Sequence, residues 1–119
     1  MTSKVIDLMN TLLKREFNAN ETMAQLKMTK ECTWKVLSWG AKDWLVFNGL
    51  PDLCKGMSFK VNARRHKGYV LIALNWDDTY EVHFISTQGN LKHSMDNVYF
   101  DELTNKIDDH IEKVSDYAW

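Results

Sequence analysis

Three runs of alternating apolar and polar residues lie between Met57 and Ile85. Alternation at period two is the pattern of a β-strand with one buried face. The sequence therefore predicts three antiparallel strands that share one apolar face. The buried positions are Met57, Phe59 and Val61, then Val70, Ile72 and Leu74, and then Tyr80, Val82 and Phe84.

The last two runs also predict a register. Because a slip by one residue would move every large side chain to the other face, the apolar positions have to pair with one another. The expected pairs are Val70 with Phe84, Ile72 with Val82 and Leu74 with Tyr80. Asn75 then lies opposite Thr79, and the loop is Trp76-Asp77-Asp78. We expect Asp78 in the left-handed region, as is common for the last residue of such a loop.

Helical spacing appears at both ends of the chain. Apolar residues before residue 18 recur at steps of three and four, which predicts a helix that Thr2 or Ser3 can cap. They are Val5, Leu8, Met9, Leu12, Leu13 and Phe17. A second short helix, capped by Asn20, is predicted to carry Met23, Leu26 and Met28. A C-terminal helix is predicted from a cap at Asp101 to about Asp116, with Leu103, Ile107, Ile111 and Val114 on its apolar stripe.

Aromatic and β-branched residues dominate the segment from Thr33 to Phe47. Because residues 40–43 offer a turn, the pattern predicts a hairpin whose Trp34, Trp39 and Trp44 pack against the sheet. Residues 48–52 hold the only proline and predict a surface loop. A further short strand is expected around residues 91–95.

This order of elements predicts an α+β fold. We expect an antiparallel sheet of about five strands, with N-terminal and C-terminal helices packed on one face. A chain of 119 residues is expected to form a single domain. Its parts are a helical N-terminal segment over 1–30, the sheet over 33–96 and the C-terminal helix over 98–116.

Composition narrows the class of protein. The chain is 45% hydrophobic and 26% charged, with a net charge of −1, which argues against a disordered tail or a strongly basic coat protein. The two cysteines, Cys32 and Cys54, have no metal-ligand or CxxC spacing, so we expect free buried thiols in a reducing cytoplasm. Neither a signal peptide nor an apolar run of about 20 residues occurs, so no membrane contact is expected.

Three segments carry a resemblance to a known group. They are Trp39-Gly40-Ala41-Lys42-Asp43-Trp44, then Ser58-Phe59-Lys60 with the hairpin from Leu74 to Val82, and Val98-Tyr99-Phe100-Asp101-Glu102-Leu103. From about Met23 onward the chain resembles small uncharacterised proteins of bacterial phages, plasmids and conjugative elements. The resemblance implies a compact α+β module and a mobile-element setting. It implies no activity, because the group has none established.

A basic loop is the first candidate site. No acidic residue occurs between Leu53 and Trp76, and Lys60, Arg64, Arg65 and Lys67 are candidate ligands for nucleic acid or another polyanion. The alternative is a solvated loop whose charge protects a sheet edge. Residues 96–116 hold seven acidic residues and two lysines. The loop and this acidic helix could meet across a symmetric homodimer, pair within one chain or face water.

A mixed outer sheet face is the second candidate. The predicted register turns Tyr69, Leu71 and His83 away from the helices, and such a face fits a surface that a partner covers. The alternative is that another part of the chain packs over it. Trp76, at the tip of a hairpin, is the candidate exposed contact residue.

Catalytic patterns are weak. Glu81 and His83 are neighbours on one strand face and could form an acid/base pair. His83, His93 and Asp96 could be imagined as a metal site, and Asp77 with Asp78 as paired carboxylates. No nucleophile motif or glycine-rich phosphate loop accompanies them. Surface histidines and turn-forming aspartates are therefore favoured, with no catalytic residue, metal or cofactor.

The sequence favours a non-enzymatic domain of phage or mobile-element origin that binds a protein partner, as a monomer or homodimer. A host-modulating or accessory role fits this setting by analogy alone. A nucleic-acid-binding accessory protein is the alternative. A small hydrolase or metal-dependent enzyme is the third reading.

Overall fold

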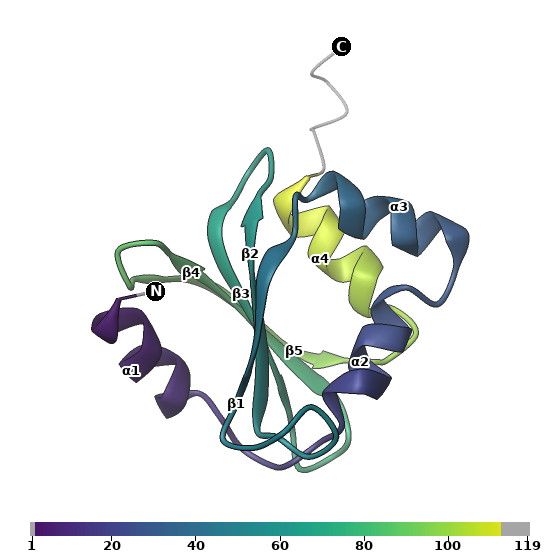
Figure 1. The fold of residues 1–119 in the computed structure, drawn as a ribbon. Helices are drawn as coiled ribbons and strands as arrows, with labels where there is room; N and C mark the ends of the chain where they lie inside the picture. Colours follow the sequence, from purple (N-terminus) through teal and green to yellow (C-terminus); the bar gives the residue numbers. More distant parts are fainter. Residues whose placement is uncertain (1, 113–119) are drawn as a thin grey trace.

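A five-stranded antiparallel sheet forms the centre of the computed structural model, which describes residues 2–112 (Figure 1). The strands follow one another across the sheet in chain order. They are β1 (Lys42–Phe47), β2 (Gly56–Asn62), β3 (Lys67–Leu74), β4 (Tyr80–Ser86) and β5 (Leu91–Val98). The helices are α1 (Ser3–Thr11), α2 (Ala19–Leu26), α3 (Lys30–Ser38) and α4 (Leu103–Ile111). The predicted α+β class with an antiparallel sheet is confirmed.

The predicted register of the β3–β4 hairpin is also confirmed. Val70 pairs with Phe84, Ile72 with Val82 and Leu74 with Tyr80. The Asn75 N–H donates to the Thr79 carbonyl at 2.7 Å and closes the three-residue loop. Asp78 has a φ of 66°, in the left-handed region, as expected for its place in the loop.

The main hydrophobic core lies between one face of the sheet and helices α2, α3 and α4 (Figure 1). Trp39, at the end of α3, is fully buried there and stacks on Phe59, with ring centroids 6.1 Å apart. Trp44 of β1 is partly buried and stacks on the same ring at 4.4 Å. Both tryptophans thus contact the Phe59 ring of β2, which joins the end of α3 and strand β1 to the centre of the sheet.

Helix α1 covers the opposite face of the sheet, where Val5 and Met9 pack against Tyr69, Leu71 and Ile85 (Figure 1). The prediction that the N-terminal and C-terminal helices share one face is therefore wrong for α1. It holds for α2 and α4, and α3, which the sequence pattern did not predict as a helix, packs on the same face.

The chain changes faces directly after α1. The helix ends at Thr11 rather than continuing to Phe17. Arg15 and Phe17 instead form isolated bridges with Leu74 and Cys54. This extended stretch passes one end of the sheet and lets α1 and α2 lie on opposite sides.

The predicted hairpin over residues 33–47 is wrong, because residues 30–38 form α3. The Thr29 hydroxyl caps this helix by accepting a hydrogen bond from the Cys32 N–H at 3.0 Å. Cys32 and Val36 lie on the buried side, whereas Trp34 is 63% exposed. The expected burial of Trp39 is confirmed, and that of Trp34 is wrong.

Two predicted helix caps differ from the structure. Asn18, rather than Asn20, caps α2 by accepting hydrogen bonds from two backbone N–H groups. Helix α4 begins at Leu103 with Glu102 as its N-cap and without a capping side-chain hydrogen bond. The predicted continuation to Asp116, with Val114, lies outside the described residues. The helical N-terminal part thus extends to residue 38, and the sheet covers residues 42–98.

Both cysteines are buried free thiols, as predicted. Among the residues that the structure describes, no helix combines the length and the apolar character that crossing a membrane requires.

Candidate functional site

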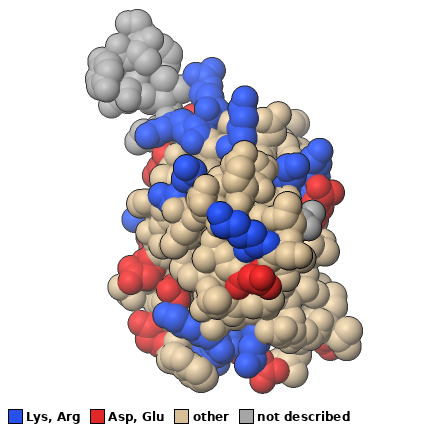
Figure 2. Space-filling view, turned by 90° about the vertical axis from the view of Figure 1, so that its left-hand side faces the viewer, with Lys and Arg blue, Asp and Glu red and all other residues tan. Residues whose placement is uncertain are grey.

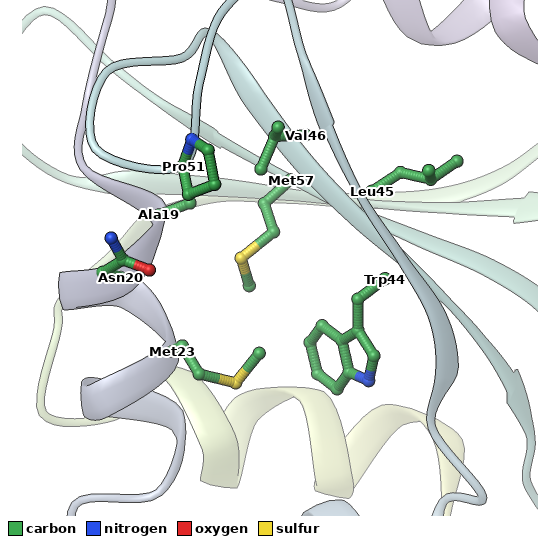
Figure 3. Close-up of a pocket in the computed structure, with 8 residues that line it drawn as sticks. All are labelled: Ala19, Asn20, Met23, Trp44, Leu45, Val46, Pro51 and Met57. Carbon is green, nitrogen blue, oxygen red and sulfur yellow. The ribbon is translucent and has the colours of Figure 1, made fainter.

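An apolar pocket of about 410 Å³ lies between α2, β1 and the loop before β2 (Figure 3). Met23 of α2, Trp44 and Val46 of β1, Pro51 of the loop and Met57 of β2 are among the residues that line it. Figure 3 shows the side chains of Met23, Met57 and Trp44 directed toward a common open space. Two methionines in the lining make the pocket adaptable in shape.

The pocket adjoins an edge strand. In the described sheet β1 pairs with β2 alone, so the other side of its backbone presents N–H and C=O groups without a strand partner. Leu45 lies on the other face of the strand from its neighbours Trp44 and Val46, yet it lines the same pocket. The pocket therefore opens along the edge of β1.

Exposed leucines continue this apolar surface beyond the pocket. Leu45 is 46% exposed, and Leu50 and Leu53, on either side of Pro51, are 69% and 56% exposed. Large apolar side chains gathered around an apolar opening are typical of interaction surfaces.

The opposite edge of the sheet is protected. Strand β5 exposes Lys92, His93 and Asp96, has two register irregularities against β4, and bends at Asn97, where φ is 54°. Charges and bulges of this kind prevent a further strand from pairing. Strand β1 has a single register shift, between Lys42 and Leu45, where Asp43 has a φ of 56°, and its apolar residues 45–47 then pair regularly with β2.

A second pocket, of about 220 Å³, contains three lysines. Lys42 of β1, Lys60 of β2 and Lys67 of β3 line it together with Asn62 and Thr87. Figure 2 shows Lys and Arg side chains gathered at the upper end of the molecule, on the side that faces left in Figure 1. The predicted candidates Lys60 and Lys67 are thus brought together, and Lys42 joins them from a strand that the basic-loop hypothesis did not include.

The basic loop and the acidic helix meet within one chain. The Arg64 N–H donates to Glu112 Oε1 at 3.1 Å, and the Arg65 N–H donates to the carbonyl of Ile111 at 2.7 Å. Both contacts use the loop's backbone at the C-terminal end of α4, where carbonyls lack helical partners. The sequence left this arrangement open beside a dimer contact.

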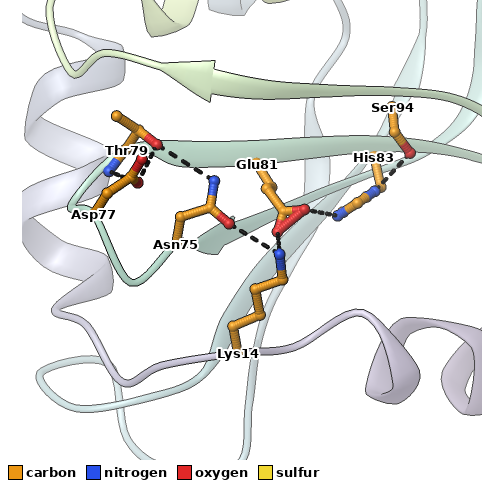
Figure 4. Close-up of polar contacts among 7 residues, drawn as sticks. All are labelled: Lys14, Asn75, Asp77, Thr79, Glu81, His83 and Ser94. Carbon is orange, nitrogen blue, oxygen red and sulfur yellow. Dashed lines mark hydrogen bonds and ion pairs between the residues drawn. The ribbon is translucent and has the colours of Figure 1, made fainter.

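A polar network fastens the segment after α1 to the outer sheet face (Figure 4). The Lys14 ammonium lies 2.7 Å from Glu81 Oε2 and donates to Asn75 Oδ1 at 3.1 Å. His83 Nδ1 lies 2.7 Å from the Ser94 hydroxyl. Burial lowers the pKa of His83, and the neighbouring Glu81 carboxylate offsets part of that effect. The imidazole is therefore neutral at pH 7.

The predicted partner surface on the outer face is covered by the chain itself. Tyr69, Leu71 and His83 are 7%, 0% and 5% exposed beneath α1 and the segment that follows it. Trp76, by contrast, is 76% exposed at the hairpin tip, as expected. Of the four partner candidates, Trp76 alone is therefore accessible.

The candidate acid/base residues make contacts that stabilise the fold. Glu81, His83 and Ser94 follow the order carboxylate, imidazole, hydroxyl that acyl-transfer enzymes use. However, Glu81 Oε1 lies 3.9 Å from His83 Nε2, beyond hydrogen-bond distance, and the carboxylate pairs with Lys14. Asp77 accepts hydrogen bonds from the Thr79 N–H and hydroxyl, which lower its pKa and shape the turn.

The imagined metal site is divided between the two faces of the sheet. His83 contacts Ser94 on the outer face, whereas His93 stacks on His110 of α4, with ring centroids 4.3 Å apart. Within residues 2–112, no cluster of three or more His, Cys, Asp or Glu side chains is placed to hold a metal ion.

Three histidines surround Phe84 near the C-terminal end of α4, an arrangement that the sequence did not predict. The ring centroids of His66, His93 and His110 lie 5.6, 5.9 and 4.3 Å from that of Phe84. Burial lowers the pKa of His110 to about 4, and the charges of His93, His66 and Arg65 contribute in the same direction. His110 is therefore neutral at pH 7 where α4 meets the sheet.

These features define an α+β domain with an apolar edge-strand pocket and a separate lysine pocket. Neither a family model, a curated protein nor a solved structure matches the chain.

Proposed function

We propose that the protein is a binding domain that takes an extended segment of a partner protein along the edge of β1. The observation that carries this proposal is the apolar pocket, which opens along a strand edge that pairs with no other strand among the described residues. An added strand would satisfy the outward N–H and C=O groups of β1, and one of its side chains would enter the pocket. The contrast with the protected β5 edge supports β1 as the docking edge.

The residues that line the pocket determine which side chain of the partner segment can enter it. Met23, Trp44, Val46 and Met57 offer an apolar cavity, so the entering side chain is aliphatic or aromatic. Burying one such side chain contributes about 1.5–3 kcal/mol. Association and ordering of the segment cost more than this single contact supplies, so further apolar contacts are needed. The exposed leucines around the pocket provide them.

A setting in the bacterial cytoplasm and a phage or mobile-element origin belong to the same proposal. The buried free thiols suit a reducing compartment. The resemblance of the Gly40 turn and of the β3–β4 hairpin to mobile-element proteins favours an accessory or host-modulating role, in which the segment comes from a bacterial protein.

Photo-crosslinking tests the proposal. Benzoylphenylalanine replaces Leu45 on β1 or, as a control, Leu91 on β5, and the tagged protein is irradiated in bacterial lysate. The two leucines are both 46% exposed and both lie on edge strands. We expect position 45 to crosslink an extended apolar segment of one protein and position 91 to crosslink none.

Capture of a protein is informative only if it depends on the β1 edge. A charge on an edge strand prevents pairing, so Leu45→Lys should abolish capture while Leu91→Lys retains it. Equal capture by both variants, or equal crosslinking from both positions, would contradict the proposal.

A further inference from the structure

We propose that Lys42, Lys60 and Lys67 form a binding site for the phosphate group of a small phosphorylated molecule. The site lies in the second pocket and is independent of the proposed binding along β1. It rests on the unbalanced charge of the three lysines, on the neutral donors beside them, and on a described pocket lining that contains no aromatic residue.

The lysine charges are unbalanced among the described residues. Lys42 and Lys60 are directly paired across β1 and β2, and like charges in such positions destabilise a sheet. None of the three lysines forms an ion pair with a described acidic residue. The Lys60 ammonium lies 5.9 Å from the centroid of the Tyr69 ring, which holds its side chain over β3. A bound anion would offset the electrostatic repulsion among the ammonium groups of the three lysines.

The pocket also offers neutral donors. Asn62 carries an amide group and Thr87 a hydroxyl, and both line the cavity with the lysines. A phosphate group has several strong acceptor oxygens, which can accept hydrogen bonds from the charged and the neutral donors together. At Gly68, in the same lining, an added Cβ would lie 2.4 Å from the carbonyl oxygen of Ile85. The backbones of β3 and β4 thus approach closely here. The lysines and Asn62 are held on paired strands, and Thr87 directly follows β4.

The surroundings favour a small phosphorylated molecule over a nucleic-acid strand. Binding of single-stranded nucleic acid generally uses aromatic side chains on which bases stack. Tyr69, beside the pocket, is buried, and the exposed Trp76 follows the other end of β3. A strand of eight residues separates its two ends by about 25 Å. Neither Tyr69 nor Trp76 therefore offers an accessible stacking platform beside the lysines, and none of the residues that line the pocket is aromatic.

Titration with pyrophosphate at constant ionic strength, followed by amide chemical shifts, tests the site. We expect saturable shifts at Lys42, Lys60, Lys67 and Thr87. Lys60→Met and Lys67→Met should each weaken binding by roughly tenfold, because each removes a charge-assisted hydrogen bond. Lys55→Met is the matched control, since Lys55 is half-buried like Lys60 but lies outside the pocket.

Three results would overturn the proposal. Sodium chloride at the same ionic strength could produce the same shifts, or Lys55→Met could weaken binding as much as Lys60→Met. Single-stranded DNA could also bind far more tightly than pyrophosphate, with shifts that extend beyond the pocket. The last result would assign the lysines to a nucleic-acid backbone instead. Since Leu45 does not line this pocket, failure here leaves the crosslinking test of β1 intact.

Discussion

The burial of Trp39 gives the sharpest stability prediction. Its side chain is fully buried, stacks on Phe59, and donates its indole N–H to Asp108 Oδ1 at 2.9 Å. Truncation of a buried aromatic residue typically costs about 3–5 kcal/mol. We therefore expect Trp39→Ala to lower the free energy of unfolding by about 3–5 kcal/mol, a large share of the stability of a small domain.

Two further variants separate the hydrogen bond of Trp39 from its ring packing and provide a control for the loss of an exposed tryptophan. Trp39→Phe keeps an aromatic ring against Phe59 but loses the hydrogen bond to Asp108, so its cost should be about 1–3 kcal/mol. Trp34→Ala is the matched control on the same segment, because Trp34 is 63% exposed and should change stability by less than about 0.5 kcal/mol.

Urea unfolding followed by far-ultraviolet circular dichroism measures all three variants without relying on tryptophan fluorescence. Equal costs for Trp34→Ala and Trp39→Ala would refute the reasoning, because the helical geometry of α3 places these two side chains in different environments. A cost below about 1 kcal/mol for Trp39→Ala would refute it as well.

Three further predictions concern charge and thiols. Lys14→Met should cost about 1–3 kcal/mol, because it leaves the half-buried Glu81 carboxylate unpaired, and a second change to Glu81→Gln should restore part of that loss in urea unfolding. The folded pKa of His110, about 4, lies below its unfolded value near 6.5, so the unfolded state binds the proton first and stability should fall as pH decreases from 6.5 toward 4. Urea titrations at several pH values should show a smaller decrease for His110→Asn, with His66 and His83 accounting for part of the slope that remains. Both cysteines are buried, and burial raises the pKa of Cys54, so Ellman's reagent should modify the native thiols far more slowly than the unfolded ones.

The central hairpins were predictable because local patterns determine them. In β3 and β4 the apolar positions alternate strictly, and one register alone buries all of them. The loop chemistry agrees with that register, since Asp78 tolerates the left-handed conformation that the turn requires.

Helix α3 was missed because its sequence contains two periodicities. Trp34, Val36 and Ser38 occupy alternate positions, a pattern that favours a strand. Cys32, Val36 and Trp39 follow helical spacing, and Thr29 offers a cap before them. Those signals could have predicted the helix.

The candidate surfaces depended on long-range placement that the sequence did not reveal. The apolar stripe of α1 could cover either face of the sheet, so nothing local indicated that it would cover Tyr69 and Leu71. Lys42 reaches Lys60 through a β1–β2 pairing whose register shifts between Lys42 and Leu45. The apolar pocket likewise requires α2 and β1 to meet across a loop.

Amide hydrogen exchange of β1 tests the central claim most directly. The segment that crosslinks at position 45 is synthesised as a peptide and added to the protein at saturating concentration. If it pairs as a strand, the outward N–H groups of residues 42–47 acquire hydrogen bonds and their exchange slows, while exchange in β5 stays unchanged. Unchanged exchange throughout β1, or slower exchange in β5 instead, would contradict strand addition at this edge.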